Sequence, residues 1–372
     1  MPDRGRIHFV GSIPGKDASE VFTKCCASVG DYLARVPDGE TGYRTNYIGH
    51  LAHTVYARHP DIVTVSRPPP VDPDNPQEWR QPGEDWLPMA KDGSDMWKFT
   101  LRKGVKTLHI DTLGYADAAI ESYKVFCEAR ERDIIPAGVR FQVSLPAVVD
   151  GMGLFIHRLT DMRYFVPAYE NAMAADIRRM LEVIPPRDLA IQWDNVCGVL
   201  EYEAKVTGQN MPMKIPLLLK LMMGSPVKRF RRMLSAFAAN IPSETEFGLH
   251  FCYGDIGHKH ALEPRDLSVC VRLANEAVDH AGRSVDWIHM PAPRGRKDDV
   301  YYQPLQNLND APRLYLGLVH LTDGVEGTKT RIEVAKRYKA EFGISTECGF
   351  GRRPPETIPQ LLELHKQAAR LL

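Results

Sequence analysis

The stretch that decides the fold runs from residue 247 to residue 290 and reads FGLHFCYGDIGHKHALEPRDLSVCVRLANEAVDHAGRSVDWIHM. It begins with an apolar, aromatic run over Phe247–Tyr253 and ends with a second such run over Val285–Met290. Between them, Pro264–His280 carries the amphipathic pattern of a helix. A strand, a helix and a second strand in this order are typical of a parallel sheet whose strands are joined by crossover helices.

The same alternation continues in both directions along the chain. The eight strand-like runs are Ile7–Gly11, Tyr32–Pro37, Val139–Leu145, Leu189–Trp193, Phe247–Tyr253, Val285–Met290, Leu314–Val319 and Gly343–Glu347. Helical patterns are found at Ala18–Val29, Ala116–Arg132, Phe165–Val183, Val227–Ala239, Pro264–His280, Arg331–Phe342 and Glu356–Leu372. Eight β/α units favour a closed α/β barrel, the (β/α)8 TIM barrel, over an open sheet. We expect residues 1–372 to form this single domain.

One segment interrupts the alternation after the second predicted strand. Pro60–Trp97 is rich in proline, aspartate and tryptophan, and we place an inserted loop at residues 60–100. A surface loop packed on its own aromatic side chains and a lid over the barrel mouth are equally weighted alternatives, because long ordered loops are often functional. Just after this segment, Val105–Ile110 is a candidate extra strand.

Charge and composition exclude several classes of protein. Lys and Arg total 47, as do Asp and Glu, so no overall positive field favours nucleic acid or an anionic membrane. The polar start Met1–Arg6 is unlike a signal peptide, and no apolar run reaches the ~20 residues of a membrane span. We therefore expect a cytoplasmic protein. Seven cysteines in a chain of this length indicate free thiols or metal ligands, not a disulfide framework.

A metal site is predicted where strand ends carry histidine and cysteine. His250 and Cys252 are two residues apart in one strand-like run, so both side chains project from the same face. Zinc binds imidazole nitrogen and thiolates. Cys348 ends the last predicted strand, and strand ends of a barrel converge at the face that carries active sites. The alternative is that His250 and Cys252 are ordinary buried residues.

A second pair of histidines has metal-like spacing in Gly257-His258-Lys259-His260. Histidines in loops at this spacing are more often solvated than bound to metal. We therefore interpret His258 and His260 as a solvated loop.

Five short blocks resemble those of the catalytic barrel of cobalamin-independent methionine synthase and of the zinc-dependent thiol alkyltransferases that share this barrel. The blocks are Val10-Gly11-Ser12-Ile13-Pro14, Asp38-Gly39-Glu40, Ile191-Gln192-Trp193-Asp194, His250-Phe251-Cys252 and Glu347-Cys348-Gly349-Phe350. They follow the family's order, and each lies at the end of a predicted strand. The resemblance covers most of the chain in scattered blocks and is densest in the last third.

The resemblance implies a role for each matching residue. It implies that a catalytic zinc ion is held by the cluster His250, Cys252 and Cys348. It also implies that Ser12 binds the carboxylate of an amino-acid thiol, whereas Glu40 and Asp194 hold its ammonium group.

Three blocks depart from the family's pattern. Ile288-His289-Met290-Pro291 lacks the glutamate that serves as the fourth zinc ligand, so either His289 replaces it or the position is open to water or substrate. Asp194-Asn195-Val196 lacks one carboxylate of the matching block. His320-Leu321-Thr322 stands where the family has an Asp-x-His pair, and it makes His320 the candidate for catalytic proton transfer.

The function predicted from these features is that of a zinc-dependent transferase. It would activate a small-molecule thiol as a thiolate and pass an alkyl group, with methyl favoured, from a small-molecule donor to the sulfur. One alternative is a lyase or ring-opening enzyme that uses zinc as a Lewis acid. Another is a non-catalytic zinc-binding protein, although Ser12, Glu40 and Asp194 at strand ends argue against it.

Overall fold

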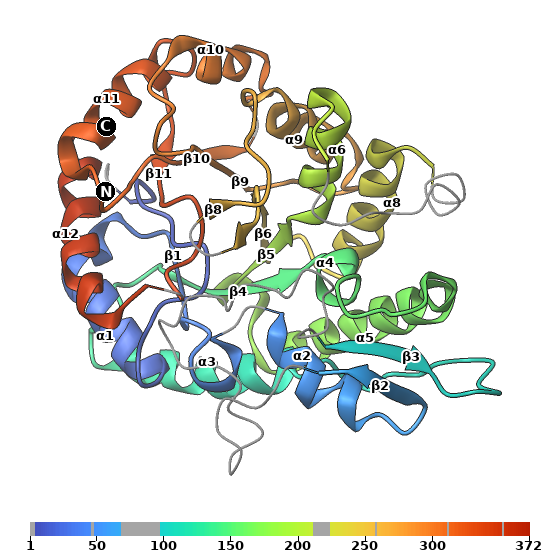
Figure 1. Ribbon diagram of the computed structural model, residues 1–372. Helices are drawn as coiled ribbons and strands as arrows, with labels where there is room; N and C mark the ends of the chain where they lie inside the picture. The colour runs from blue at the N-terminus through green and yellow to red at the C-terminus, as the bar shows by residue number, and fades with distance from the viewer. Residues whose placement is uncertain are drawn as a thin grey trace.

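Seven parallel strands form the central sheet of the computed structural model, which describes residues 4–45, 48–67, 97–210, 224–256, 259–310, 312–351 and 353–372. In the order in which they lie side by side, the strands are β1 (Arg35–Pro37), β4 (Arg140–Pro146), β5 (Leu189–Asn195), β6 (Glu246–Phe251), β9 (Trp287–Pro291), β10 (Arg313–Gly317) and β11 (Gly343–Ile344). Their side chains are almost all buried, as expected for a parallel sheet with helices on its outer face. Figure 1 shows the strands at the centre with the helices around them.

The N-terminal segment closes this sheet into a barrel. Ile7 forms parallel bridges both with Leu33, just before β1, and with Ile344 in β11. The Ile344 amide also donates to the Arg6 carbonyl at 2.8 Å. The two edges of the sheet are thereby joined, which confirms the predicted α/β barrel. The first predicted strand, Ile7–Gly11, takes part through bridges and does not form a regular strand.

Long helices cover the outside of the barrel, most of them at the predicted places. They are α1 (Ala18–Val29), α3 (Tyr115–Glu131), α5 (Met162–Val183), α6 (Cys197–Thr207), α8 (Pro226–Ala238), α9 (Ser268–His280), α11 (Gly324–Lys336) and α12 (Ile358–Ala369). Shorter helices follow β1, β4 and β9, namely α2 (Gly49–Thr54), α4 (Val148–Met152) and α10 (Asp299–Tyr302). Within the described part of the chain, no helix combines the length and apolar character needed to cross a membrane.

Local sequence explains where particular helices begin. The Asp17 side chain accepts a hydrogen bond from the Glu20 amide at 2.9 Å, so α1 starts at its predicted residue with a side-chain cap. Helix α11 starts at Gly324, whereas the sequence predicted a start at Arg331. Arg331 is fully buried and its guanidinium pairs with Asp323 at 2.8 Å. This ion pair links the first two turns of α11 to Asp323, the residue that precedes the helix.

The segment after β1 differs in part from the prediction. β2 (Ile62–Ser66) pairs antiparallel with β3 (Lys98–Leu101), and residues 68–96 between them lie outside the described part of the chain. The candidate strand Val105–Ile110 is wrong: half of its residues are exposed and its backbone joins no sheet, and β3 is the strand that pairs with β2. The lid alternative for residues 60–100 stays a prediction.

The interior near the amino ends of the strands is filled by side chains. The Arg35 guanidinium carbon lies 3.9 Å from the centroid of the Trp287 ring, and Arg35 pairs with Glu246 at 3.0 Å. Gly248 in β6 makes room for this ring, since a Cβ atom there would lie 2.0 Å from two of its carbons. This end of the barrel is therefore closed, which leaves the carboxyl ends of the strands for a functional site.

Candidate metal centre and adjoining pocket

Three donor side chains meet at the carboxyl ends of β6 and β11. The imidazole of His250 and the thiols of Cys252 and Cys348 place their ligand atoms within 4.8 Å of one another. His250 and Cys252 are buried, whereas Cys348 is partly exposed. One imidazole nitrogen and two thiolates form a donor set that suits zinc, and three protein ligands leave the fourth position for a substrate. The structure thus brings together the three residues predicted as ligands.

Backbone contacts hold the Cys348 loop against the first strand end. The Phe350 amide donates to the Ser12 carbonyl at 2.6 Å. The approach favours glycine on both sides of Phe350. A Cβ atom on Gly351 would lie 2.8 Å from the Ser12 Cβ atom and would force a shift, and one on Gly349 would make a tight contact at 3.1 Å from the Ser12 nitrogen. The candidate ligand Cys348 and the predicted carboxylate-binding residue Ser12 therefore lie on adjoining segments.

His289 does not face the cluster as a fourth ligand. Its Nδ1 lies 2.7 Å from Nδ1 of His250, and its Nε2 lies 3.0 Å from the carbonyl oxygen of Thr346. Both ring nitrogens are therefore engaged within the protein. Of the two alternatives raised by the sequence, the geometry favours a fourth position that is open to substrate.

Glu40 stands next to this surface with an unusual backbone. Its φ angle is +52° and follows Gly39 at +81°, a left-handed conformation that is uncommon for a residue with a side chain and is often found at functional sites. The Ser12 hydroxyl donates to the Glu40 carboxylate. Burial raises the pKa of Glu40 to about 7, although the Ser12 hydrogen bond and Arg44 oppose the shift.

Asp194, near the end of β5, is a second acid in the neighbourhood of Glu40. Burial and the nearby carboxyl group of Glu40 raise its pKa well above the usual value. Its carboxylate accepts a hydrogen bond from Gln192 Nε2 at 2.8 Å. Two carboxyl groups that hinder each other's ionisation favour the binding of a cation between them. The predicted substrate residues Ser12, Glu40 and Asp194 thus lie together beside the metal cluster.

A tyrosine that the sequence did not single out belongs to the same pocket. A small hollow next to Glu40 is lined also by Arg44, Tyr115 and Ser144. The Tyr115 hydroxyl is buried and has no hydrogen-bond partner among the residues that the structure describes, which marks it as a group that a ligand can satisfy. Tyr115 begins α3 after a segment without regular structure, so no local pattern would have identified it.

His320 meets a carboxylate from the neighbouring strand end. Its Nε2 donates to the Ala292 carbonyl at 2.9 Å, and its Nδ1 lies 3.6 Å from Glu347. Burial lowers the pKa of His320 to about 4 in spite of Glu347. The side chain is therefore a neutral imidazole at pH 7, with Nδ1 as its basic atom.

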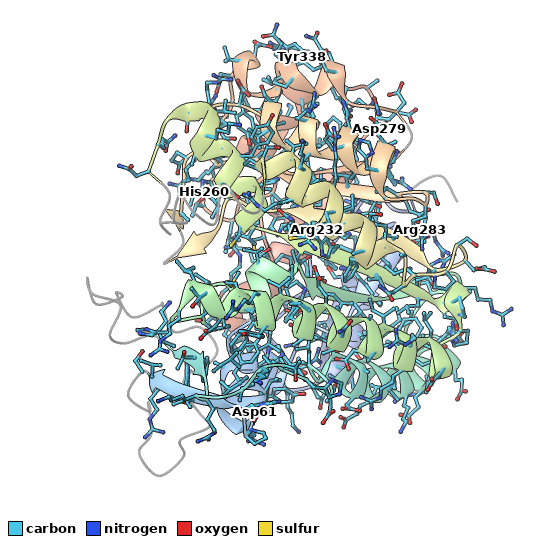
Figure 2. The ribbon with its side chains drawn as sticks, turned by 90° about the vertical axis from the view of Figure 1, so that its right-hand side faces the viewer. Asp61, Arg232, His260, Asp279, Arg283 and Tyr338 are labelled. Atoms are coloured by element: carbon cyan, nitrogen blue, oxygen red, sulfur yellow. The ribbon has the colours of Figure 1, made fainter. Side chains whose placement is uncertain are left out.

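His260 also contacts Glu347, in contrast to the solvated loop that the sequence suggested. It lies at the end of a hairpin of β7 (Asp255–Ile256) and β8 (Lys259–His260), and its Nε2 is 3.0 Å from the Glu347 carboxylate. Figure 2 labels His260 on this hairpin. Burial opposes its charge, yet the carboxylates of Glu347 and Glu263 raise its pKa to about 9. The other histidine of the pair, His258, lies outside the described residues.

Comparisons with known proteins give only distant similarities. No protein-family model matches the sequence, and no curated protein matches it. The structure is similar to a proposed vitamin-B12-independent methionine synthase from Listeria monocytogenes, with 14% sequence identity, 72% of each chain covered and a TM-score of 0.47. It is also similar to a B12-independent methionine synthase from a Shewanella species in complex with selenomethionine, with 10% identity, 77% of this chain and 74% of that chain covered, and a TM-score of 0.46. The assignment of the barrel rests on the strand order described above.

Proposed function

We propose that the protein is a zinc-dependent transferase that passes an alkyl group, with methyl favoured, to the sulfur of a small thiol carrying an ammonium group. The observation that carries this proposal is the cluster of His250, Cys252 and Cys348, whose ligand atoms lie within 4.8 Å of one another beside two acids. A structural zinc site is usually closed by four protein ligands and needs no polar pocket next to it.

The chemistry starts from the poor nucleophilicity of a neutral thiol. Zinc held by these three residues would lower the pKa of a coordinated substrate thiol, so that the thiolate is present at neutral pH. Glu40 and Asp194 would bind the ammonium group of the same substrate. The backbone N–H of Ser12 would donate to the substrate carboxylate, because the Ser12 hydroxyl already donates to Glu40. These contacts would fix the sulfur at one place relative to the alkyl donor.

His320 is the residue proposed to move a proton. Because its Nε2 hydrogen is donated to the Ala292 carbonyl, Nδ1 is the atom that would accept a proton. Glu347, 3.6 Å from this nitrogen, would stabilise the resulting positive charge. His320 would therefore act as a base towards a substrate or water molecule at the mouth of the barrel.

A second candidate function is that of a lyase or ring-opening enzyme in which zinc polarises an oxygen atom. The orientation of His289 supports this second candidate, because it leaves the fourth zinc position without a protein ligand. Such a position can bind oxygen as well as sulfur. Proton release separates the two candidates. A thiol must lose its proton to bind as a thiolate, whereas an oxygen ligand bound through a lone pair need not.

The test is a calorimetric titration of amino-acid thiols into the zinc-loaded protein in buffers of different ionisation enthalpy. We expect about one proton released per site, with sulfur entering the zinc coordination shell in X-ray absorption spectra. Cys252→Ser and Cys348→Ser should abolish the signal, whereas Cys127→Ser, at a half-buried cysteine of α3 outside the cluster, should retain it. Turnover of a substrate without a thiol, combined with no proton release by thiols, would favour the lyase or ring-opening function.

A further inference from the structure

A chain of hydrogen bonds connects two of the proposed zinc ligands through His289. His250 in β6 lies directly opposite His289 in the parallel pairing of β6 with β9, and their Nδ1 atoms are 2.7 Å apart. On its other side, His289 Nε2 is 3.0 Å from the Thr346 carbonyl oxygen. The Thr346 hydroxyl in turn donates to the Cys348 carbonyl at 2.6 Å. His289 therefore lies between the strand that carries one ligand and the loop that carries another.

The position of each hydrogen follows from what the partners can do. A carbonyl oxygen only accepts, so Nε2 of His289 must carry a hydrogen and donate it to Thr346. His289 is fully buried and its ring centroid lies 4.8 Å from that of His250 and 5.8 Å from that of His8. Two Nδ1 atoms 2.7 Å apart share one hydrogen, so one ring donates and the other accepts. A ring that holds zinc through Nε2 carries its hydrogen on Nδ1, which makes His250 the donor and Nδ1 of His289 the acceptor.

The tautomer of His250 follows from this assignment. In the 2.7 Å contact between the two Nδ1 atoms, His250 donates its Nδ1 hydrogen, since His289 has none at that atom. A neutral imidazole carries one hydrogen on its ring nitrogens, so Nε2 of His250 keeps its lone pair. A lone pair on Nε2 is what a metal ion needs.

We propose that His289 is a positioning residue of the metal centre. It holds His250 in the tautomer that presents Nε2 to zinc, and it links the imidazole to the Cys348 loop through Thr346. Because both of its nitrogens are used in this way, it leaves the fourth coordination position to the substrate. The inference rests on the proposed zinc site but not on the reaction carried out there.

The experiment compares zinc binding by full-length variants, measured by competition with a chromogenic chelator. His289→Leu leaves the His250 donor and the Thr346 acceptor unpaired, and we expect it to weaken zinc binding about 10- to 100-fold, as removal of such partners of metal ligands typically does. His289→Gln offers an acceptor oxygen and a donor amide at one end of the side chain, so binding should return towards that of the wild type. His8→Leu is the matched control: this neighbouring histidine is equally buried but bonds to Gln192 at 2.8 Å, and its loss should leave zinc affinity unchanged.

X-ray absorption of the zinc-loaded wild type without thiol tests whether His289 is a zinc ligand, even if the His289→Leu variant does not fold. One imidazole and two sulfur ligands support the inference, whereas two imidazoles would make His289 a ligand and overturn it. Unchanged zinc affinity in a folded His289→Leu protein would also overturn it, as would equal losses in His289→Leu and His8→Leu. A protein that binds zinc as expected but releases no proton with any thiol would instead refute the proposed transferase function and leave this inference standing.

Discussion

Replacing Glu40 with glutamine should stabilise the protein at neutral and higher pH while it weakens the binding of an ammonium ligand. The amide side chain of the Glu40→Gln variant keeps an acceptor for the Ser12 hydroxyl and the same left-handed backbone, so the change removes little besides the ionisable group. Buried acids at binding sites are commonly maintained at a cost in stability. Glu40→Gln tests whether this carboxyl group is such a case.

The magnitude follows from the pKa of the group in the folded and unfolded protein. Burial raises the pKa of Glu40 from 4.5 to about 7. The folded protein therefore holds more protons than the unfolded chain between these values, and its stability must fall as the pH rises through this range. One pKa unit corresponds to about 1.4 kcal/mol, so Glu40 should cost about 3 kcal/mol at pH 8 and almost nothing at pH 4.

Urea unfolding of metal-free wild type and Glu40→Gln at pH values from 4 to 8 measures this difference directly. The two proteins should have similar free energies of unfolding at pH 4 and should diverge up to pH 7, with the variant more stable. Glu333→Gln, which removes an exposed carboxylate on α11, controls for the change of net charge. A wild type that equals or exceeds the Glu40→Gln variant in stability at pH 8 would refute the reasoning, because the carboxylate would then be well solvated or well paired.

Three further changes test other parts of the structure. Gly248→Ala should destabilise the protein by about 1–3 kcal/mol in urea unfolding, because its Cβ atom would lie 2.0 Å from the Trp287 ring; an unchanged midpoint would contradict the packing described for the closed end of the barrel. Tyr115→Phe removes a buried hydroxyl that has no hydrogen-bond partner within the described part of the chain. Calorimetry should therefore show about fivefold to tenfold weaker binding of an amino-acid thiol at no cost in thermal stability, and equal affinity would exclude the hydroxyl from the site. His260→Gln removes a group whose pKa is raised from 6.5 to about 9, mainly by Glu347 against the effect of burial. The loss of stability in this variant should be greatest below pH 6.5 and should vanish as the pH rises through 9. A loss that does not change with pH would rule out the ion pair as its cause.

The barrel was predictable because its signals are local. Helix α1 begins and ends at its predicted residues, and β5 and β6 lie within one or two residues of the predicted runs. Apolar periodicity over ten to twenty residues is set by which face each element buries, and the chain itself displays it. Val105–Ile110 has a strand-like composition as well, but a strand also needs a partner edge, and no local pattern shows that β3 has taken it.

Local sequence patterns predicted only part of the candidate metal cluster. The spacing of His250 and Cys252 places both on one face of a strand, and the resemblance to known blocks indicated Cys348 as well as the pocket residues Ser12, Glu40 and Asp194. These side chains converge because parallel strands direct all their carboxyl ends to one side of a barrel.

The sequence alone therefore determined the barrel and predicted the donor types of the candidate metal cluster and the acids beside it, whereas the contacts of several neighbouring residues depended on tertiary structure. His289 is 39 residues from His250 and 57 from Thr346 in the chain, and only closure of the barrel makes it the link between them. His260 reaches Glu347, and the Tyr115 hydroxyl lines the hollow beside Glu40, for the same reason. Hydrogen bonds and ion pairs act over a few ångströms between atoms that lie far apart in sequence, so periodicity and spacing carry no record of them.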